Sequence, residues 1–421
     1  MIALTIIFWC VKLLLFRTLN FFLTNLTEMG EVHLQIKKQF IDGKWVHAER
    51  NESREVINPF NKEVIAKVTE SDKTDAKKAI LAARNAFDHG EWPTMSATER
   101  GNVVRKIAEL IKRDMEELAK LETLDTGKTL EESRWDMEDI AGVFAYYAIP
   151  NSISKVVYEP VGVCAQITPW NYPLLQASWK LAPALVAGNT LVMKPSEITP
   201  LTTIKVFELM EEAGVPKGVV NLVLGPGNTV GAELSENADV DLVSFTGGIE
   251  TGKKIMQAAS HTVKKVALEL GGKNPNIVFA DADFDIAVDQ ALNAVFFHAG
   301  QVCSAGTRLI VEESIHDDFV DALVKRVKNI KLGSGFEEDT EMGPLISKEH
   351  LQKVINYVDK GIEEGATVAI GGKQPDAEEL KNGFFYMPTV LTNCTTTMSV
   401  VKHEGFGPVI TVEKFTTEEE A

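Results

Sequence analysis

Short apolar runs alternate with single helical stretches after residue 161, and this rhythm constrains the fold more than any other feature of the chain. The runs are VGVCAQI, NTLVMK, VVNLVL, VDLVSF and KVALEL, and the stretches between them lie at about 174–187, 201–213, 228–236 and 250–260. Strands joined by single helices are typical of βαβ units in a parallel sheet. We therefore expect a nucleotide-type α/β domain over residues 165–270.

A second α/β stretch follows this domain. It contains the apolar runs NIVF and RLIVE and helical patterns at about 283–297, 314–330 and 347–364. Ahead of residue 161, short strands are expected over 31–58, with Asp42-Gly43 as a hairpin turn, and amphipathic helices over 72–89, 97–124 and 129–148. The predicted architecture is two α/β lobes with a cleft between them.

Charge and cysteine usage exclude some classes of function. The chain has 43 Lys and Arg against 60 Asp and Glu, a net charge of −17 at pH 7, so it would repel a nucleic-acid backbone. Its four cysteines, Cys10, Cys164, Cys303 and Cys394, lie far apart without a C-x-x-C pair. Neither a disulfide framework nor a structural zinc site is favoured, and no metal is expected.

Residues 1–28 form an apolar leader that differs from the rest of the chain. Fourteen Ile, Leu, Val or Phe residues lie between positions 2 and 23, but Lys12 and Arg17 interrupt them. On an insertion scale the apolar residues gain roughly 4–8 kcal/mol and the two cations cost about 5–7 kcal/mol. We favour a start at Met29, or an artefact, over a membrane anchor in residues 1–26, and expect a cytoplasmic protein.

Three motifs lie where predicted parallel strands end, which is where open α/β sheets bind ligands. Gly225 begins GPGNTVG, one residue off the usual dinucleotide fingerprint, and Gly247-Gly248 begins a helix that could hold a phosphate. Lys194 and Glu197 in MKPSE could bind ribose hydroxyls. Each motif alone has an ordinary alternative, a tight turn for the glycines and a surface ion pair for Lys194 and Glu197.

A carboxylate and a thiol form the fourth piece. Glu269 ends an apolar run before Gly271-Gly272, so its carboxylate should project at a strand end. Cys303 lies in the small-residue sequence GQVCSAG, which leaves room for a substrate at the sulfur. A thiolate nucleophile with a separate carboxylate base suits acyl chemistry, and the alternative is a buried, inert thiol.

Taken together and in this order, the motifs closely resemble the aldehyde dehydrogenase superfamily. The match runs from about Gln39 to Val412 and includes TPWNYP, KPSE, FTG, ELGGKNP, GQVCSAGTR, MGPLIS and EGFGP. Within the family, the chain looks most like the bacterial betaine-aldehyde dehydrogenases. The resemblance implies a two-lobed fold, with a Rossmann-like NAD-binding domain over 29–268 and an α/β catalytic domain over 269–421, in a homodimer or homotetramer.

The resemblance also implies a catalytic set. Cys303 matches the nucleophile, which adds to an aldehyde and gives a thiohemiacetal and then, after hydride transfer, a thioester. Asn171 matches the amide that stabilises the oxyanion together with the Cys303 N–H, and Glu269 matches the base that activates water. Lys180 matches a lysine at the site. We expect a helix start or a cation near Cys303 to lower its pKa.

NAD is the cofactor that the resemblance implies. Lys194 and Glu197 match ligands of the adenosine ribose, and a carboxylate at 197 would repel the 2′-phosphate of NADP. Glu404 in EGFGP matches a ligand of the nicotinamide ribose. The other implied cofactor-binding residues are Ile167, Trp170, Gly225, Gly247 and Gly248.

The substrate follows less directly. Tyr172 and Trp179 are seven residues apart, two helical turns on one face, and match positions that line the family's aldehyde tunnel. Aromatic rings there suit a quaternary ammonium through cation–π contacts worth about 2 kcal/mol. We expect betaine aldehyde and an osmoprotective product, glycine betaine. Ordinary core packing of the two rings and another amino- or aliphatic aldehyde remain alternatives.

Two departures from the family pattern affect the prediction. The stretch near 148–158 is shorter than the family's oligomerisation arm, and the chain ends at Ala421 where family members continue. We therefore expect a catalytic domain that is incomplete at its C-terminal end. The alternative to an active dehydrogenase is an inactive remnant that at most binds nucleotide.

Overall fold

The computed structural model describes residues 35–149 and 159–421. The predicted leader, 1–28, and nearly all of the shortened stretch, 148–158, lie outside the described residues. None of the helices in the described ranges has the length and apolar character needed to cross a membrane. The chain divides into two units, Met1–Ile36 and Lys37–Ala421, and the elements discussed below belong to the second unit, except that β1 begins at Ile36.

A seven-stranded sheet confirms the predicted βαβ rhythm. Its strand order is β10-β9-β6-β7-β8-β2-β3, and the first five of these strands run parallel. The parallel strands are β6 (Val163–Ile167), β7 (Thr190–Lys194), β8 (Val220–Leu222), β9 (Leu242–Gly247) and β10 (Lys265–Leu270). Their carboxyl ends therefore lie along one edge of the sheet.

An antiparallel hairpin extends this sheet beyond β8. It consists of β2 (Gln39–Ile41) and β3 (Lys44–Val46), and Phe40 of β2 pairs with Leu222. The turn between them is Asp42-Gly43, with φ angles of 50° and 71°. Two consecutive residues with positive φ are typical of a two-residue type I′ turn, so the predicted hairpin is confirmed.

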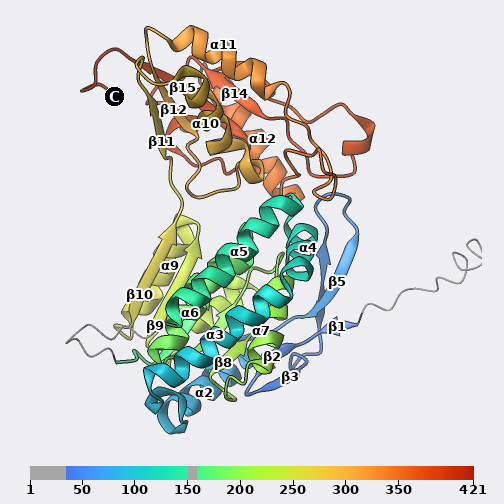
Figure 1. Cartoon of the computed structure of the whole chain (residues 1–421), viewed down its shortest axis with the longest axis vertical. Helices are drawn as coiled ribbons and strands as arrows, with labels where there is room; N and C mark the ends of the chain where they lie inside the picture. The colour runs from blue at the N-terminus through green and yellow to red at the C-terminus, as the bar shows by residue number, and fades with distance from the viewer. Residues whose placement is uncertain (1–34, 150–158) are drawn as a thin grey trace, which may run out of the picture. The chain divides into compact units, whose positions relative to one another are not determined.

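Helices cover both faces of the seven-stranded sheet. The core on one face is built from α3 (Ala97–Arg113), α4 (Met115–Thr126), α5, α6 and α7, and the core on the other face is built from α2, α8 and α9. Their bounds are α2 (Lys73–His89), α5 (Leu130–Tyr147), α6 (Pro173–Ala187), α7 (Leu201–Glu212), α8 (Ala232–Glu236) and α9 (Ile249–Ser260). Figure 1 shows α9 lying against β9 and β10.

One predicted helix is wrong. The stretch 97–124 forms two helices, α3 (Ala97–Arg113) and α4 (Met115–Thr126), which meet at Asp114. Asp114 has φ −99° and ψ 15°, outside the helical region, and its carboxylate binds the Arg113 guanidinium at 2.7 Å. Aspartate competes with helix backbone for hydrogen bonds, whereas the apolar stripe continues across the break and conceals it.

The helix predicted over 228–236 is also only partly α-helical. Its first half, Gly227–Gly231, is a π-helical turn (η2), and only α8 after it is regular. The predicted helices over 72–89 and 129–148 are confirmed. Both begin with a capping box, at Asp72 and at Thr129.

The second α/β stretch forms a five-stranded sheet with a core of its own. The strand order is β11-β12-β15-β14-β13, parallel except for β13. Bounds are β11 (Pro275–Val278), β12 (Arg308–Glu312), β13 (Thr367–Ile370), β14 (Thr389–Thr392), β15 (Val409–Phe415), α10 (Phe284–Phe296), α11 (His316–Val327) and α12 (Lys348–Glu363). The predicted α/β class is confirmed in both sheets.

The remaining elements are short. They are β1 (Ile36–Lys37), β4 (Ser53–Ile57), β5 (Val64–Thr69), η1 (Trp92–Thr94), η3 (Phe297–Gly300), η4 (Glu378–Leu380) and α13 (Ser399–Lys402). The chain leaves the seven-stranded sheet after Leu270 and enters the five-stranded sheet at Pro275. This crossing begins with the Gly271-Gly272 pair, two residues after Glu269.

Candidate active site

Cys303 lies in an irregular loop after η3 and is half-buried. Its carbonyl oxygen accepts a hydrogen bond from Asn274 Nδ2 at 2.9 Å. Burial raises the pKa of its thiol, and the negative charges of Glu404 and Glu269 add to that effect, while the N–H groups of Cys303 and Ser304 oppose it. The expected lowering of this pKa by a cation or helix start is therefore wrong for the protein without ligands.

Asn171 reaches the loop of Cys303 from the segment between β6 and α6. It is 4% exposed, and its Nδ2 donates to the carbonyl oxygen of Gln301 at 2.8 Å. An amide nitrogen carries two hydrogens, so one can fix the orientation of the group while the other faces a ligand. The structure thus brings Asn171 and the loop of Cys303 together, as the predicted oxyanion site requires.

Glu269 projects from the edge strand β10 of the seven-stranded sheet. Exposure alternates along this strand, and Glu269 is one of its exposed residues, opposite Thr246 in register. The charge of Glu269 influences the pKa values of both Cys303 and Lys180. The prediction that this carboxylate projects at a strand end rather than into a core is confirmed.

Lys180 lies on α6 and points toward the sheet. Its Nζ donates to Ser244 Oγ at 3.1 Å, and the residue is 7% exposed. Burial lowers its pKa to about 8, and Glu269 partly offsets this effect. The charge of Glu269 therefore acts on the ammonium of Lys180.

Lys194 and Glu197 form a pair at the end of β7. Lys194 is 2% exposed, so the alternative of a surface ion pair is wrong for the lysine. Its Nζ lies 3.2 Å from Glu197 Oε1, which also accepts the N–H of Gly227 at 2.5 Å. Burial opposes ionisation of Glu197, but Lys194 and the Gly227 N–H hold its pKa below the usual value. The pair links the KPSE motif to the loop that begins at Gly225.

Two of the predicted glycines differ in the space around them. A Cβ at Gly225 would lie 2.3 Å from the Ser71 carbonyl oxygen, so close packing requires glycine there. A Cβ at Gly248, at the start of α9, would meet nothing within 4 Å. The open helix start suits a phosphate, since its N–H groups can be approached closely.

The strand ends place further cofactor candidates along the same edge. Ile167 ends β6, Lys194 ends β7 and Gly247 ends β9, and these strands are parallel neighbours. A Cβ at Gly231 would lie 3.9 Å from both Ile167 Cδ1 and Lys194 Cδ. This arrangement fits a dinucleotide at the carboxyl edge of the sheet.

Glu404 lies against the backbone that follows β10. A Cβ at Gly271 would lie 2.2 Å from Glu404 Oε2, so the carboxylate fills the space that glycine leaves. Burial raises the pKa of Glu404, and the Gly272 N–H opposes this. Its Oε1 is buried without a hydrogen-bond partner in the described ranges, as expected for a group that receives a ligand hydroxyl.

Trp170, next to Asn171, packs edge-to-face against His350 and Phe406, with ring centroids 5.1 and 5.3 Å away. His350 hydrogen-bonds to the Phe406 carbonyl oxygen at 2.6 Å. Phe406 belongs to the EGFGP motif that carries Glu404. Trp170 therefore connects the Asn171 segment to the Glu404 segment.

Tyr172 and Trp179, the two residues predicted to contact the substrate, have different surroundings. Tyr172 is the N-cap of α6, with φ −132° and ψ 67°, so the two-turn spacing argument with Trp179 does not hold. The Lys128 ammonium lies 4.2 Å from the centre of the Tyr172 ring, and His298 contacts that ring edge-to-face. Tyr172 packs against the core, whereas Trp179 is 50% exposed. The alternative interpretation, ordinary core packing, is therefore wrong for Trp179.

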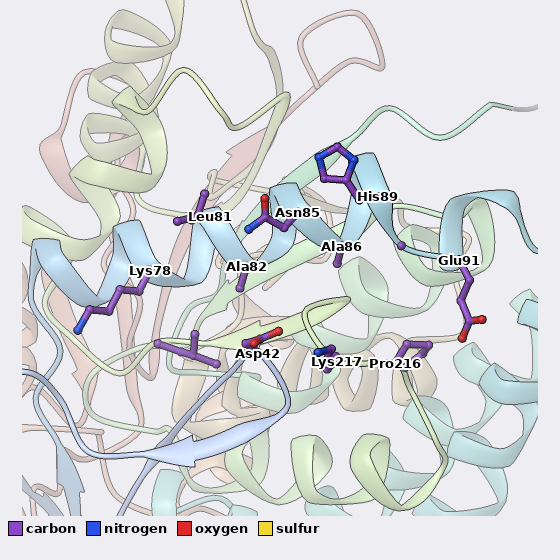
Figure 2. Close-up of a pocket in the computed structure, with 12 residues that line it drawn as sticks. Asp42, Lys78, Leu81, Ala82, Asn85, Ala86, His89, Glu91, Pro216 and Lys217 are labelled. Atoms are coloured by element: carbon purple, nitrogen blue, oxygen red, sulfur yellow. The ribbon is translucent and has the colours of Figure 1, made fainter.

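Trp179 lines a hollow of about 540 Å³ with residues of α5. The hollow combines aromatic rings with carboxylates, and its other lining residues are Glu138, Asp139, Gly142, Val143, Tyr146 and Tyr147. A separate groove of about 670 Å³ lies between α2 and the turn at Asp42 (Figure 2). It shares no residue with the candidate site.

Sequence reasoning missed the residues that support the Cys303 loop. Gln301 accepts the Asn171 amide on its carbonyl, and its side-chain oxygen accepts the Ile346 N–H at 2.9 Å. Glu132 of α5 accepts the His298 N–H at 2.7 Å. No motif marks these contacts, because they join residues from 45 to 166 positions apart.

Comparisons with known proteins agree with this geometry. The aldehyde dehydrogenase family matches residues 45–421. Betaine aldehyde dehydrogenase of Bacillus subtilis (strain 168) is 68% identical over 395 residues, which cover 90% of this chain and 81% of the relative. Aminoaldehyde dehydrogenase 2, peroxisomal, of Pisum sativum is 42% identical over 411 residues, covering 93% and 81%.

A solved structure extends the likeness to three dimensions. Betaine aldehyde dehydrogenase from Staphylococcus aureus, in complex with NAD+, is similar with a TM-score of 0.89 and 60% identity. The similarity covers 92% of this chain and 80% of that chain. The family match, the sequence relatives and the fold together show that this chain belongs to the aldehyde dehydrogenase family.

Proposed function

We propose that this chain catalyses the NAD-dependent oxidation of an aldehyde to a carboxylic acid, with betaine aldehyde as substrate and glycine betaine as product. One observation carries the proposal. Asn171 donates to the backbone of Gln301, two residues before the half-buried Cys303, and the charge of Glu269 acts on that thiol. A nucleophile, an oxyanion donor and a base are thus gathered around one sulfur.

The first step is covalent. The Cys303 thiolate adds to the aldehyde carbon and forms a tetrahedral thiohemiacetal, whose oxygen becomes negative. The free N–H of the Asn171 amide and the backbone N–H of Cys303 stabilise that oxygen. One such donor typically lowers the barrier by about 3–4 kcal/mol.

NAD, when bound, accepts the hydride that leaves the thiohemiacetal carbon. In this chain Lys194, Glu197 and the open start of α9 at Gly248 would hold the adenosine and phosphate end, and Glu404 the nicotinamide ribose. The carboxylate of Glu197 favours NAD over NADP because it would repel a 2′-phosphate. The buried, unpartnered Glu404 Oε1 supports the second assignment.

Hydrolysis of the thioester completes the reaction. Glu269 takes a proton from water, the hydroxide attacks the acyl carbon, and the Cys303 thiolate is released. The negative charge of Glu269 raises the pKa of Lys180, against the effect of burial. We propose that Lys180 places a positive charge near this carboxylate during hydrolysis.

The substrate assignment is supported by relatives and by Trp179. Trp179 is half exposed beside Glu138 and Asp139, and exposed rings with carboxylates attract an organic cation. Tyr172 contributes less, since Lys128 already covers one side of its ring. The second candidate substrate is an amino-aldehyde, because the chain is also similar to the aminoaldehyde dehydrogenase of Pisum sativum.

The experiment is a steady-state assay of NADH formation with NAD and a panel of aldehydes. We expect betaine aldehyde to give the highest kcat/KM, and NADP to give a lower rate than NAD. Calorimetry with NAD accompanies it, because NAD binding without NADH formation would favour the inactive remnant. A higher kcat/KM for an aliphatic or amino-aldehyde would contradict the substrate assignment alone.

The proposed function extends to where the protein lies in the cell and to how its subunits assemble. We propose a cytoplasmic homodimer or homotetramer, which follows from the family. Fractionation of cells and light scattering of the purified protein test these two points.

A further inference from the structure

The segment that leads to Cys303 has a strained backbone. His298, Ala299 and Gly300 have φ angles of 47°, 53° and 70°, so three consecutive residues lie in the left-handed region. Non-glycine residues avoid this region because Cβ approaches the following carbonyl oxygen. Such conformations persist where the surrounding structure holds them, and they concentrate at functional sites.

Glu132 of α5 holds the first of these residues. Its Oε1 accepts the His298 N–H at 2.7 Å, and its Oε2 accepts the Thr129 N–H at 2.7 Å. Glu132 and His298 are 5% and 3% exposed. Both residues are buried, so loss of Glu132 would leave the His298 N–H without its protein acceptor.

From His298 the contacts continue to the reacting groups. The His298 carbonyl oxygen accepts from Gln301 Nε2 at 3.2 Å, and the Gln301 carbonyl oxygen accepts from Asn171 Nδ2 at 2.8 Å. The His298 ring also packs edge-to-face against Tyr172, the residue that follows Asn171. His298 is therefore linked to Asn171 by hydrogen bonds through Gln301, and it packs against the neighbouring Tyr172.

The far end of the strained segment is held by packing. A Cβ at Gly300 would lie 2.1 Å from the Gly407 carbonyl oxygen, so the backbone there has no room to move outward. Packing therefore holds the segment at Gly300, and the hydrogen bond to Glu132 holds it at His298.

We propose that Glu132 is a positioning residue for the nucleophile loop. Its carboxylate fixes the left-handed turn at His298, and that turn sets the Asn171 amide and the Cys303 backbone at the distance that the oxyanion needs. Displacements of about 1 Å at a reacting centre can lower rates about a hundredfold. The proposal rests on the proposed function, because the oxyanion forms only in that reaction.

Three variants test the proposal. Glu132→Ala removes both carboxylate oxygens that accept hydrogen bonds, and Glu132→Gln keeps one acceptor oxygen. Thr129→Ala is the matched control. It weakens the same helix start but leaves the bond to His298 in place, because only the Thr129 Oγ1 bond to the Glu132 N–H is lost. The measurement is the rate of the first NADH burst with NAD and betaine aldehyde. A stability effect alone lowers the burst amplitude and Tm but leaves the burst rate per active site unchanged.

We expect Glu132→Ala to lower the burst rate tenfold to a hundredfold, Glu132→Gln to lower it less, and Thr129→Ala to leave it within twofold of the wild type. NAD affinity should stay within twofold in all three variants. Equal burst rates in Glu132→Ala and Thr129→Ala would overturn the proposal.

Hydrogen exchange of the wild-type protein provides a test that needs no variant. We expect the His298 amide to exchange as slowly as amides inside α5, and a rate typical of an exposed loop would overturn the proposal even if Glu132→Ala does not fold. Failure of the proposed function is recognised separately. In that case the wild type makes no NADH, while alkylation of Cys303 by iodoacetamide still compares the variants.

Discussion

The cofactor edge and the nucleophile loop are built in opposite ways. Ile167, Lys194 and Gly247 end parallel strands, and regular βαβ geometry alone places them side by side. Cys303 follows a strained, irregular segment that side chains from α5 and from the Asn171 segment hold in place. The difference teaches that regular secondary structure positions the proposed cofactor-binding residues of this chain, whereas long-range contacts position the loop of Cys303.

Removal of the sulfur is expected to have the largest effect on the reactive half. Cys303→Ala cannot form the thiohemiacetal, so NADH formation should fall below detection, while NAD binding at the strand ends remains. The measurement is NADH absorbance together with calorimetry of NAD binding. Normal turnover by Cys303→Ala would contradict the assignment of the nucleophile.

Glu269→Gln should separate the two chemical steps. Loss of a general base typically lowers a rate 10²- to 10⁴-fold, and here only thioester hydrolysis should slow. We expect a full NADH burst followed by a very slow steady state. A variant that loses the burst as completely as the steady state would show that Glu269 acts before hydride transfer.

A pair of glycine variants tests the cofactor edge. Gly225→Ala places a methyl group against the Ser71 carbonyl oxygen and should destabilise the fold by about 1–3 kcal/mol. Gly248→Ala meets open space, so Tm should stay within a degree or two while NAD affinity falls about tenfold. Thermal unfolding and calorimetry distinguish them, and a stable Gly225→Ala with normal affinity would contradict the close packing.

The smallest effect concerns the thiol's own ionisation. Burial raises the pKa of Cys303, and the charge of Glu404 raises it further, so the reactive thiolate increases as pH rises. Alkylation by iodoacetamide should therefore have its midpoint above the value of about 8.5 for free cysteine. Glu404→Gln removes one negative charge and should move that midpoint to lower pH, whereas Glu418→Gln, at an exposed position, serves as the control.

Prediction from sequence succeeded where the pattern is local. The βαβ rhythm, the Asp42-Gly43 hairpin and the helices over 72–89 and 129–148 follow from residues that are neighbours in the sequence. The break at Asp114 was missed because the apolar stripe continues through it.

The motifs predict which residues react, but the contacts that support those residues were not predictable from sequence. Glu132 and His298 are 166 positions apart, and nothing in either stretch signals a contact. Tyr172 shows the same limit. Seven-residue spacing to Trp179 indicated a shared helix face, yet Tyr172 lies outside the helix and beneath Lys128.

Mass spectrometry of trapped enzyme tests the central claim most directly. Glu269→Gln is mixed with NAD and betaine aldehyde, quenched in acid during the burst, and digested. We predict that the peptide carrying Cys303 gains the mass of one betaine acyl group in proportion to the NADH released. NADH released without any acyl group on that peptide would contradict the account.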